Sequence, residues 1–225
     1  VSELVQDKRF KGMEEQLRSG WGALLKPLAW QGALCYCPSS SSKATFTHPA
    51  SFLTNWNGLP DPAEAAPAVI KRYLSAYGPA TPETFDAWLS RNSNRKSTLR
   101  GWFASLGEQI VEVRVEGETR YLLAEHEDEL AATRPSRATH LLGAFDQFVL
   151  GPGTKDTHML ANKHRSRVSK AAGWIAPVLT QGGRITGVWE MDDGNLVVTP
   201  FPGEQAPPSK VLEDAAARLA AVHGL

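Results

Sequence analysis

Two segments of the chain concentrate basic side chains, which are the groups that proteins use to bind phosphate. The first segment, Arg91–Leu106, contains four Lys or Arg residues and no Asp or Glu. Hydroxyl and backbone N–H groups at the start of a helix can also meet a phosphate oxygen. The predicted contacts are Arg91, Arg95, Lys96, Ser97, Thr98 and Arg100. The alternative interpretation is that these side chains only solvate a helix.

The second basic segment, Lys155–Lys170, carries five Lys or Arg residues against a single acid, Asp156. Such a run beside a sheet predicts a row of basic side chains that binds backbone phosphates. The predicted contacts are Lys163, His164, Arg165, Arg167 and Lys170. A solvated loop is the alternative interpretation of the same charges.

The sequence contains no catalytic motif of a familiar kind. There is no Ser-His-Asp set, P-loop or dinucleotide fingerprint, and the Gly-Pro-Gly run at 151–153 lacks the strand-to-helix context of a phosphate loop. Asp146 is flanked by apolar residues in the run AFDQF. It is therefore either buried and paired with an Arg or a functional acid with a raised pKa. We favour the paired, structural role.

Metal-ligand spacings are also missing from the sequence. Cys35 and Cys37 are the only cysteines, and one Cys-x-Cys pair favours two free thiols over a zinc site. His158 and His164 do not lie at a ligand spacing with Cys or carboxylate residues. The sequence therefore predicts no metal, and free thiols fit a reducing, cytoplasmic setting.

Length and charge limit the possible function classes. The chain has 225 residues, enough for one large domain or two small ones, and its formal net charge is zero. Zero net charge gives no overall attraction to nucleic acid, so DNA binding must depend on local basic segments. No apolar run is long enough to cross a membrane and no signal peptide is visible, so we expect a cytoplasmic protein.

The first basic segment lies inside a pattern of three helices followed by a hairpin. Apolar spacing and cap residues predict helices over 62–77, 82–90 and 95–106, and a tight turn at 116–117 joins two strands. This order is typical of a winged helix, whose third helix lies in the major groove of DNA. Acidic residues in the wing would be repelled by phosphate. These acids are Glu112, Glu116 and Glu118.

Helical spacing also predicts which residues of this unit face its core. They are Val69, Ile70, Tyr73, Leu74, Tyr77, Phe85, Trp88, Leu89, Leu99, Trp102, Phe103 and Leu106.

Changes of composition divide the chain into three predicted domains, 1–56, 57–133 and 134–225. The first repeats the order of the central unit's end: helix, Gly, strand, tip, strand and helix. It is interpreted as the back half of another winged helix, with opening helices at Val1–Val5 and Phe10–Gln16 and a serine-rich tip. We therefore expect the chain to begin inside a domain.

The third predicted domain is rich in strands. Two Gly-containing turns join strands over 174–179, 184–191 and 196–201, and apolar residues over 141–150 precede them. Ser209 caps a last amphipathic helix that would cover the sheet. The predicted fold class is α+β, with tandem winged-helix units, the first one incomplete, followed by an antiparallel-sheet domain with a C-terminal helix.

Several runs of the chain together resemble the bacterial winged helix DNA-binding domain family. That family includes DNA glycosylases that unhook interstrand crosslinks and excise alkylated purines. The runs are GALCYCPSSSSKATF, KRYLSAYGPATPETFDAWL, LLGAFDQFVLG, KHRSRV and GWIAPVLTQGGRITGVWE. The resemblance implies tandem winged helices around a concave, DNA-sized channel, without a metal or organic cofactor. The characterised glycosylases depend on a pair of glutamines in the first unit, and no Gln-x-Gln occurs here. No catalytic residue is therefore carried over.

The first functional hypothesis is a winged-helix protein of DNA repair that binds double-stranded DNA without catalysis. The second is a DNA glycosylase for alkylated or crosslinked bases whose catalytic N-terminal part is absent from this chain. The third is a scaffold for protein interactions. In that case, reversing the charges of the basic residues would leave DNA binding unchanged.

Overall fold

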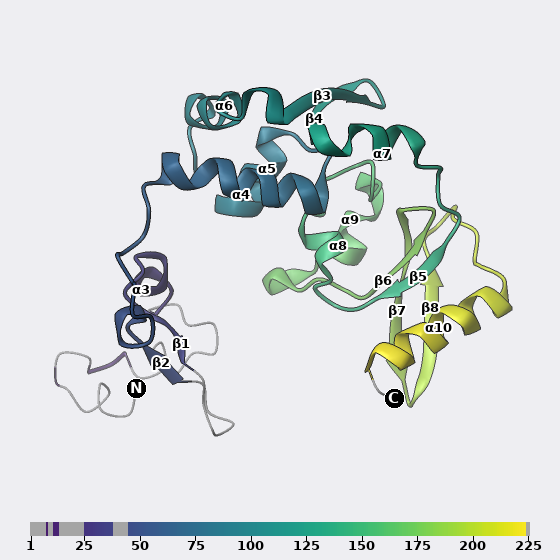
Figure 1. Ribbon diagram of the computed structural model, residues 1–225. Helices are drawn as coiled ribbons and strands as arrows, with labels where there is room; N and C mark the ends of the chain where they lie inside the picture. The colour runs from purple at the N-terminus through teal and green to yellow at the C-terminus, as the bar shows by residue number, and fades with distance from the viewer. Residues whose placement is uncertain (1–7, 9–10, 14–24, 38–44, 224–225) are drawn as a thin grey trace. The chain divides into compact units, whose positions relative to one another are not determined.

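The computed structural model describes residues 8, 11–13, 25–37 and 45–223 (Figure 1). The chain divides into two compact units, Val1–Glu64 and Ala65–Leu225. The predicted opening helices, Val1–Val5 and Phe10–Gln16, and the serine-rich tip fall mostly or wholly outside the described residues. None of the helices in the described part of the chain has the length and apolar character needed to span a membrane.

The described part of the first unit follows the predicted order of elements. Helix α3 spans Lys26–Trp30, and strands β1 (Cys35–Cys37) and β2 (Thr45–Thr47) pair antiparallel before a short 3-10 turn. Gly32 connects α3 to β1 with a φ of +69°, a conformation that glycine adopts without strain. Cys35 and Cys37 are both free.

The second unit begins with three helices in the predicted order. They are α4 (Pro62–Tyr77), α5 (Pro82–Ser90) and α6 (Lys96–Ala104). Thr81 caps α5 as predicted: its hydroxyl accepts from the Thr84 backbone N–H at 3.1 Å, and the Thr84 hydroxyl accepts from the Thr81 N–H at 3.0 Å. This reciprocal pair satisfies donors that the first turn of a helix leaves open.

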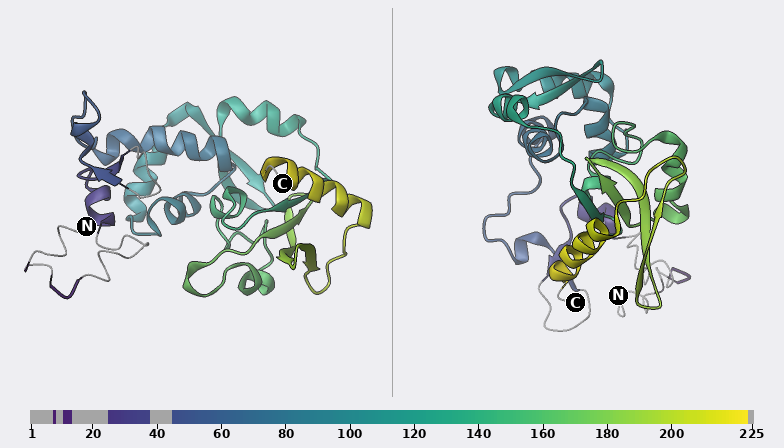
Figure 2. Two further views of the ribbon diagram at one scale, coloured as in Figure 1. Left: turned by 90° about the horizontal axis from the view of Figure 1, so that it is seen from below. Right: turned by 90° about the vertical axis from the view of Figure 1, so that its right-hand side faces the viewer.

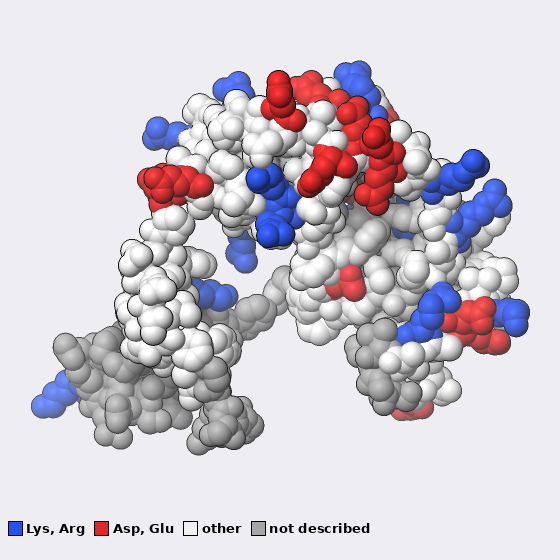
Figure 3. All heavy atoms as spheres, in the orientation of Figure 1, with Lys and Arg blue, Asp and Glu red and all other residues white. Residues whose placement is uncertain are grey.

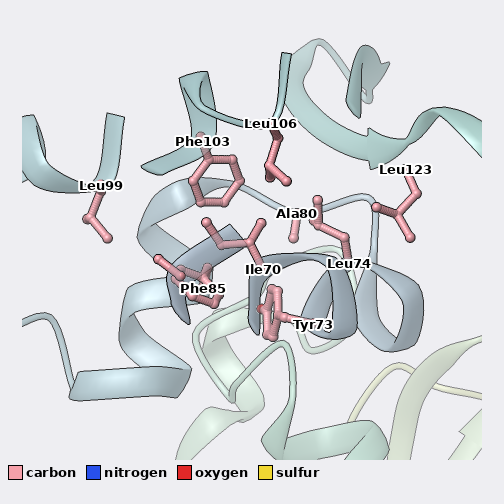
Figure 4. Close-up of a cluster of buried hydrophobic side chains, with 10 residues drawn as sticks. Ile70, Tyr73, Leu74, Ala80, Phe85, Leu99, Phe103, Leu106 and Leu123 are labelled. Atoms are coloured by element: carbon pink, nitrogen blue, oxygen red, sulfur yellow. The ribbon is translucent and has the colours of Figure 1, made fainter. Parts of the chain in front are cut away.

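The core of the three helices contains most of the residues that helical spacing predicted. Figure 4 shows Ile70, Phe85, Leu99 and Phe103 pointing toward one another, and each is at most 3% exposed. Trp88 and Leu89 differ from the prediction, since they are 40% and 44% exposed. The short α5 buries Phe85 and Asp86 instead, and the partly exposed Trp88 ring contacts the rings of Tyr73, Tyr77 and Phe85.

An antiparallel hairpin follows α6, as expected. Strands β3 (Ile110–Val115) and β4 (Glu118–Leu123) pair without a bulge around a turn in which Glu116 and Gly117 have φ of 48° and 89°. Two positive φ values are typical of the tight turn whose twist matches a hairpin. The short helix α7 (Glu127–Ala132) comes next.

A four-stranded antiparallel sheet forms the rest of the second unit. Its order is β5 (Thr139–Leu142), β6 (Val178–Gln181), β7 (Arg184–Asp192) and β8 (Asn195–Pro200). Figure 2 shows α10 (Ser209–His223) lying along this sheet, where Ala215 packs with Leu141 and Leu179. Val178 is buried on the opposite face, beside Val149 and Phe201. Strand β6 is therefore covered on both sides.

Two details of this sheet correct the sequence prediction. The strand predicted over 174–179 begins only at Val178, because Trp174 lies in a turn closed by Lys170. Residues Gln147–Leu150 form the helical turn α8, because the Asp146 carboxylate accepts from the Phe148 N–H at 2.8 Å and starts a helix.

The helical part and the sheet part of the second unit meet at Gly151. The Tyr73 hydroxyl donates to the Gly151 carbonyl at 3.2 Å, and the Tyr77 hydroxyl donates to Gln147 Oε1 at 3.2 Å. A Cβ at position 151 would lie 2.1 Å from the Tyr77 ring. Only glycine allows this close approach of α4 to the backbone after α8.

Candidate nucleic-acid interface

The loop between α5 and α6 carries the first predicted contacts and is held by one buried carboxylate. Asp86 is 2% exposed and accepts from the Ser90 hydroxyl, from the Asn94 side-chain amide at 2.7 Å and from the Asn94 N–H at 3.3 Å. Arg91 and Asn92 have left-handed backbone, with φ of 60° and 64°. Such a conformation is uncommon outside glycine, so the network around Asp86 defines the turn that leads into α6.

All residues of the first predicted contact set lie on the surface. They are Arg91, Arg95, Lys96, Ser97, Thr98 and Arg100. Helix α6 has no acidic residue in its first turn, so none of its own carboxylates neutralises the positive end of the helix dipole.

The second predicted set is only partly exposed. It lies on the short helical turns η5 (Asn162–His164) and α9 (Arg165–Val168) and the residues after them. Lys163, Arg167 and Lys170 are exposed and Arg165 is half-buried. His164 is 4% exposed and stacks on Phe201 with ring centroids 4.5 Å apart.

His164 is therefore corrected from a surface contact to a core residue. Burial lowers the pKa of its imidazole, and the charges of Lys163 and Arg167 lower it further. The neutral ring fits the apolar cluster around Phe201, because a buried cation without a partner is costly.

A groove of about 740 Å³ contains one residue from each of the two predicted sets. It lies between α5, β4 and the loop over 152–158. The residues that line it include the cations Arg91, Arg120, Lys155 and Arg165, the acids Glu83, Glu118 and Asp156, and the polar residues Asn92 and His158. Among the described residues, Arg91 and Arg165 are the members of the predicted sets that line this groove, and the others lie outside it. Lys155 was counted in the second basic segment but not predicted as a contact.

Arg165 contributes a donor that its own chain does not use. Its Nε atom is buried and meets no hydrogen-bond acceptor within the part of the chain that the structure describes. A buried N–H without an acceptor costs free energy.

A buried ion pair forms the floor of the groove. Arg120 Nη1 lies 3.1 Å from Asp156 Oδ2, and the Arg120 guanidinium also contacts Glu118 at 2.9 Å. Burial disfavours the Arg120 cation, but the charges of Asp156 and Glu118 outweigh it, so the pKa of Arg120 is raised. The ion pair connects β4 to the loop over 152–158. It therefore keeps these two sides of the groove next to each other.

The carboxylates of the acidic hairpin make ion pairs and hydrogen bonds within the fold. Glu116 contacts His158 Nδ1 and Arg184 Nη2, both at 2.8 Å, and Glu118 pairs with Arg120. The hydroxyl of Tyr121 donates to Glu112 at 3.2 Å. On the face drawn in Figure 3, the Asp and Glu side chains gather where β3, β4 and α7 lie in Figure 1. The hairpin acids are paired within the fold, which reduces the expected repulsion of phosphate.

The predicted ion pair between Asp146 and an Arg is not found among the described residues. The Asp146 carboxylate caps α8, and Asp146 is half-buried. The sequence analysis missed Asp86, Arg120 and Lys155. An Asp four residues before Ser90 and eight before Asn94 is a local signal for a capping network. No local signal marks Arg120, because its partner lies 36 residues away.

Three comparisons place the chain among known proteins. A family model described as DNA glycosylase AlkZ-like matches residues 2–222. An interstrand DNA cross-link repair glycosylase of Streptomyces sahachiroi is 57% identical over 226 residues. The solved structure of the DNA glycosylase AlkZ from the same organism aligns with a TM-score of 0.89 and 56% sequence identity. All of this chain is matched in both cases, and it spans 61% of the length of each relative.

Proposed function

The chain belongs to the AlkZ-like DNA glycosylase family, and from this premise we propose that it forms the DNA-binding part of a DNA repair glycosylase. The substrate would be double-stranded DNA with crosslinked bases, as the name of the S. sahachiroi relative suggests, or with alkylated bases, as the family resemblance implies. The glycosylase interpretation replaces the non-catalytic binding protein as the leading hypothesis.

The groove is the observation that supports this role. Cations from α5, from the loop over 152–158 and from α9 converge there as Arg91, Lys155 and Arg165. Convergent cations with an unsatisfied buried donor suit a phosphodiester oxygen better than an uncharged ligand. The exposed residues of α6 would extend the contact along the backbone.

A finer arrangement is part of the same proposal. Helices α4 to α6 with the β3–β4 hairpin would act as a winged helix, in which α6 faces DNA through Arg95, Lys96, Ser97, Thr98 and Arg100. The segment 1–56 would belong to a second such unit, and 134–225 would form a third domain. Lys163, Arg167 and Lys170 would add phosphate contacts from that domain.

Salt-dependent DNA binding tests the proposal. Fluorescence anisotropy with a labelled duplex should show affinity falling by orders of magnitude between about 50 and 200 mM salt, because phosphate contacts release counterions. Arg91→Gln, Lys155→Gln and Arg165→Gln should each weaken binding and lower the slope of log K against log salt by about one.

Arg134→Gln is the matched control, because Arg134 is exposed in the loop before β5 and does not line the groove. It should change binding far less than the groove variants. Affinity that is independent of salt would contradict the proposal. Groove variants that behave like Arg134→Gln would rule out this groove as the binding site.

A further inference from the structure

Two aromatic rings lie exposed outside the groove. Trp174 is 52% exposed, more than any other aromatic side chain of Ala65–Leu225 in the described part of the chain, and Phe145 is 38% exposed. Their centroids are 5.0 Å apart and their planes meet at 84°. Because this contact is edge to face, each ring keeps surface that the other does not cover.

The backbone holds both rings in fixed positions. Phe145 has a φ of 58°, a left-handed conformation that is uncommon outside glycine, and the cap made by Asp146 follows it directly. Trp174 closes a turn in which the Lys170 N–H donates to the Trp174 carbonyl at 2.8 Å. Ser169 and Ile175 bridge on the other side of this turn. The backbone that carries the two rings is therefore defined by contacts within the fold, and the rings touch each other.

Two cations lie near the turn that carries Trp174, and one acid, Asp146, follows Phe145 directly in the sequence. Lys170 lies directly across the turn from Trp174, and Arg167 is on the preceding helical turn α9; both are exposed. No Asp or Glu occurs in the sequence between Asp156 and Glu190. A ligand for this surface should therefore combine a flat apolar ring with a nearby negative charge.

We propose that Phe145 and Trp174 form a stacking platform for an unpaired nucleobase, whose flanking phosphate is bound by Lys170. Bases displaced from the helical stack bind to aromatic side chains in many nucleic-acid proteins. This proposal rests on the proposed DNA-binding function and adds a base site to the phosphate groove. Two rings beside cations suit a nucleotide better than a protein partner, because stable protein interfaces bury about 1,200 Å² or more.

Two DNA duplexes test the platform, one fully paired and one with the same sequence and a single unpaired base. Base stacking contributes about 1–3 kcal/mol. Trp174→Ala should therefore lower the affinity for the bulged duplex by about tenfold and leave the paired duplex within about twofold. Trp174→Phe keeps a ring and should retain most of the preference. Leu130→Ala, at an exposed apolar position on α7, is the control and should change neither affinity.

A fluorescent base analogue gives a readout that does not depend on a variant's folding. In the wild-type chain, 2-aminopurine at the unpaired position should be quenched on binding, whereas 2-aminopurine in the paired stretch should not. Binding without this difference would overturn the platform. Equal losses on both duplexes for Trp174→Ala would also overturn it, whereas loss of salt-dependent binding to the paired duplex would concern the groove alone.

Discussion

At the scale of single residues, His164 shows how burial changes the role of a basic segment. Its sequence neighbours are exposed cations, yet its ring is 4% exposed and stacked on Phe201. Burial and the nearby positive charges lower the pKa of the imidazole in the folded chain. The unfolded chain therefore binds a proton more readily than the folded chain does.

This difference predicts that acid destabilises the fold through His164. Stability from the neutral ring is complete above the unfolded pKa of about 6.5, and it is lost as the pH falls through and below that value. Urea unfolding at pH 7.5 and at pH 5.0 should show a larger loss for the wild type than for His164→Phe, which cannot titrate.

Other groups also titrate over this range, so the difference between variant and wild type is the quantity to compare. His140→Phe changes an exposed histidine on β5 and should reproduce the wild-type loss. An equal loss of stability in His164→Phe and in the wild type would contradict this prediction. It would mean that the pKa of His164 is the same in the folded and unfolded chains.

Arg120 connects three separate segments of the chain at the candidate site. It contacts Asp156, Glu118 and the Pro79 carbonyl, so it joins the hairpin to two other segments. A buried pair of this kind adds little net stability over an apolar pair, but loss of one partner is costly. Its position under the groove suggests that its main effect is to fix the groove's shape.

At the scale of elements, the contact between α4 and the residues after α8 depends on Gly151. Its backbone, with φ of −63° and ψ of −59°, would suit alanine, so the obstacle is the Tyr77 ring. That ring is held by Gln147 and lies against Tyr73 and Trp88. Gly151→Ala must therefore push α4 away from the sheet part.

We expect Gly151→Ala to lower the free energy of unfolding by about 1–3 kcal/mol, as overpacking of a close contact does. It should also weaken DNA binding, because the groove lies between α5 and the loop that follows Gly151. Urea unfolding and anisotropy measure the two effects. Gly143→Ala is the control, since a Cβ there meets no atom within 4 Å. Equal stability of the two variants would mean that Tyr77 moves freely.

At the scale of the whole molecule, the net charge is zero, so DNA binding depends on where the charged side chains lie. The equal numbers of acidic and basic residues, 24 of each, cancel any long-range attraction to DNA. The fold compensates by pairing the hairpin acids with Arg120, Arg184 and His158 while it leaves Arg91 and Lys155 beside the groove.

The length difference from the relatives leads to a prediction about catalysis. The chain spans 61% of each relative and contains no Gln-x-Gln. We expect residues 1–225 alone to bind alkylated duplex DNA without releasing a base. A fusion that supplies the unmatched part of the S. sahachiroi relative should release it. Chromatography of the freed base measures the outcome, and release by residues 1–225 alone would place the catalytic groups within this chain.

The predictions from the sequence were most accurate for the three helices and the hairpin. Helical spacing found the buried faces of α4 and α6, and Thr81 with Pro82 marked the start of α5. The sequence predictions were less accurate for the four-stranded sheet and the segments beside it. Trp174 and Phe148 are both apolar and β-prone, yet one lies in a turn and the other in α8. The Lys170 N–H donates to the Trp174 carbonyl and stabilises the turn, and the Phe148 N–H donates to the Asp146 carboxylate and starts α8.

The sequence alone therefore determined which segments become helices and strands, because spacing, caps and turns act over a few neighbouring residues. It also located the two basic segments, whose phosphate contacts stay a prediction. Only the tertiary structure decided which of those cations converge and which acids are neutralised. Arg184 reaches Glu116 across 68 residues and Arg120 reaches Asp156 across 36. Such pairings depend on how elements pack, and no local pattern encodes them.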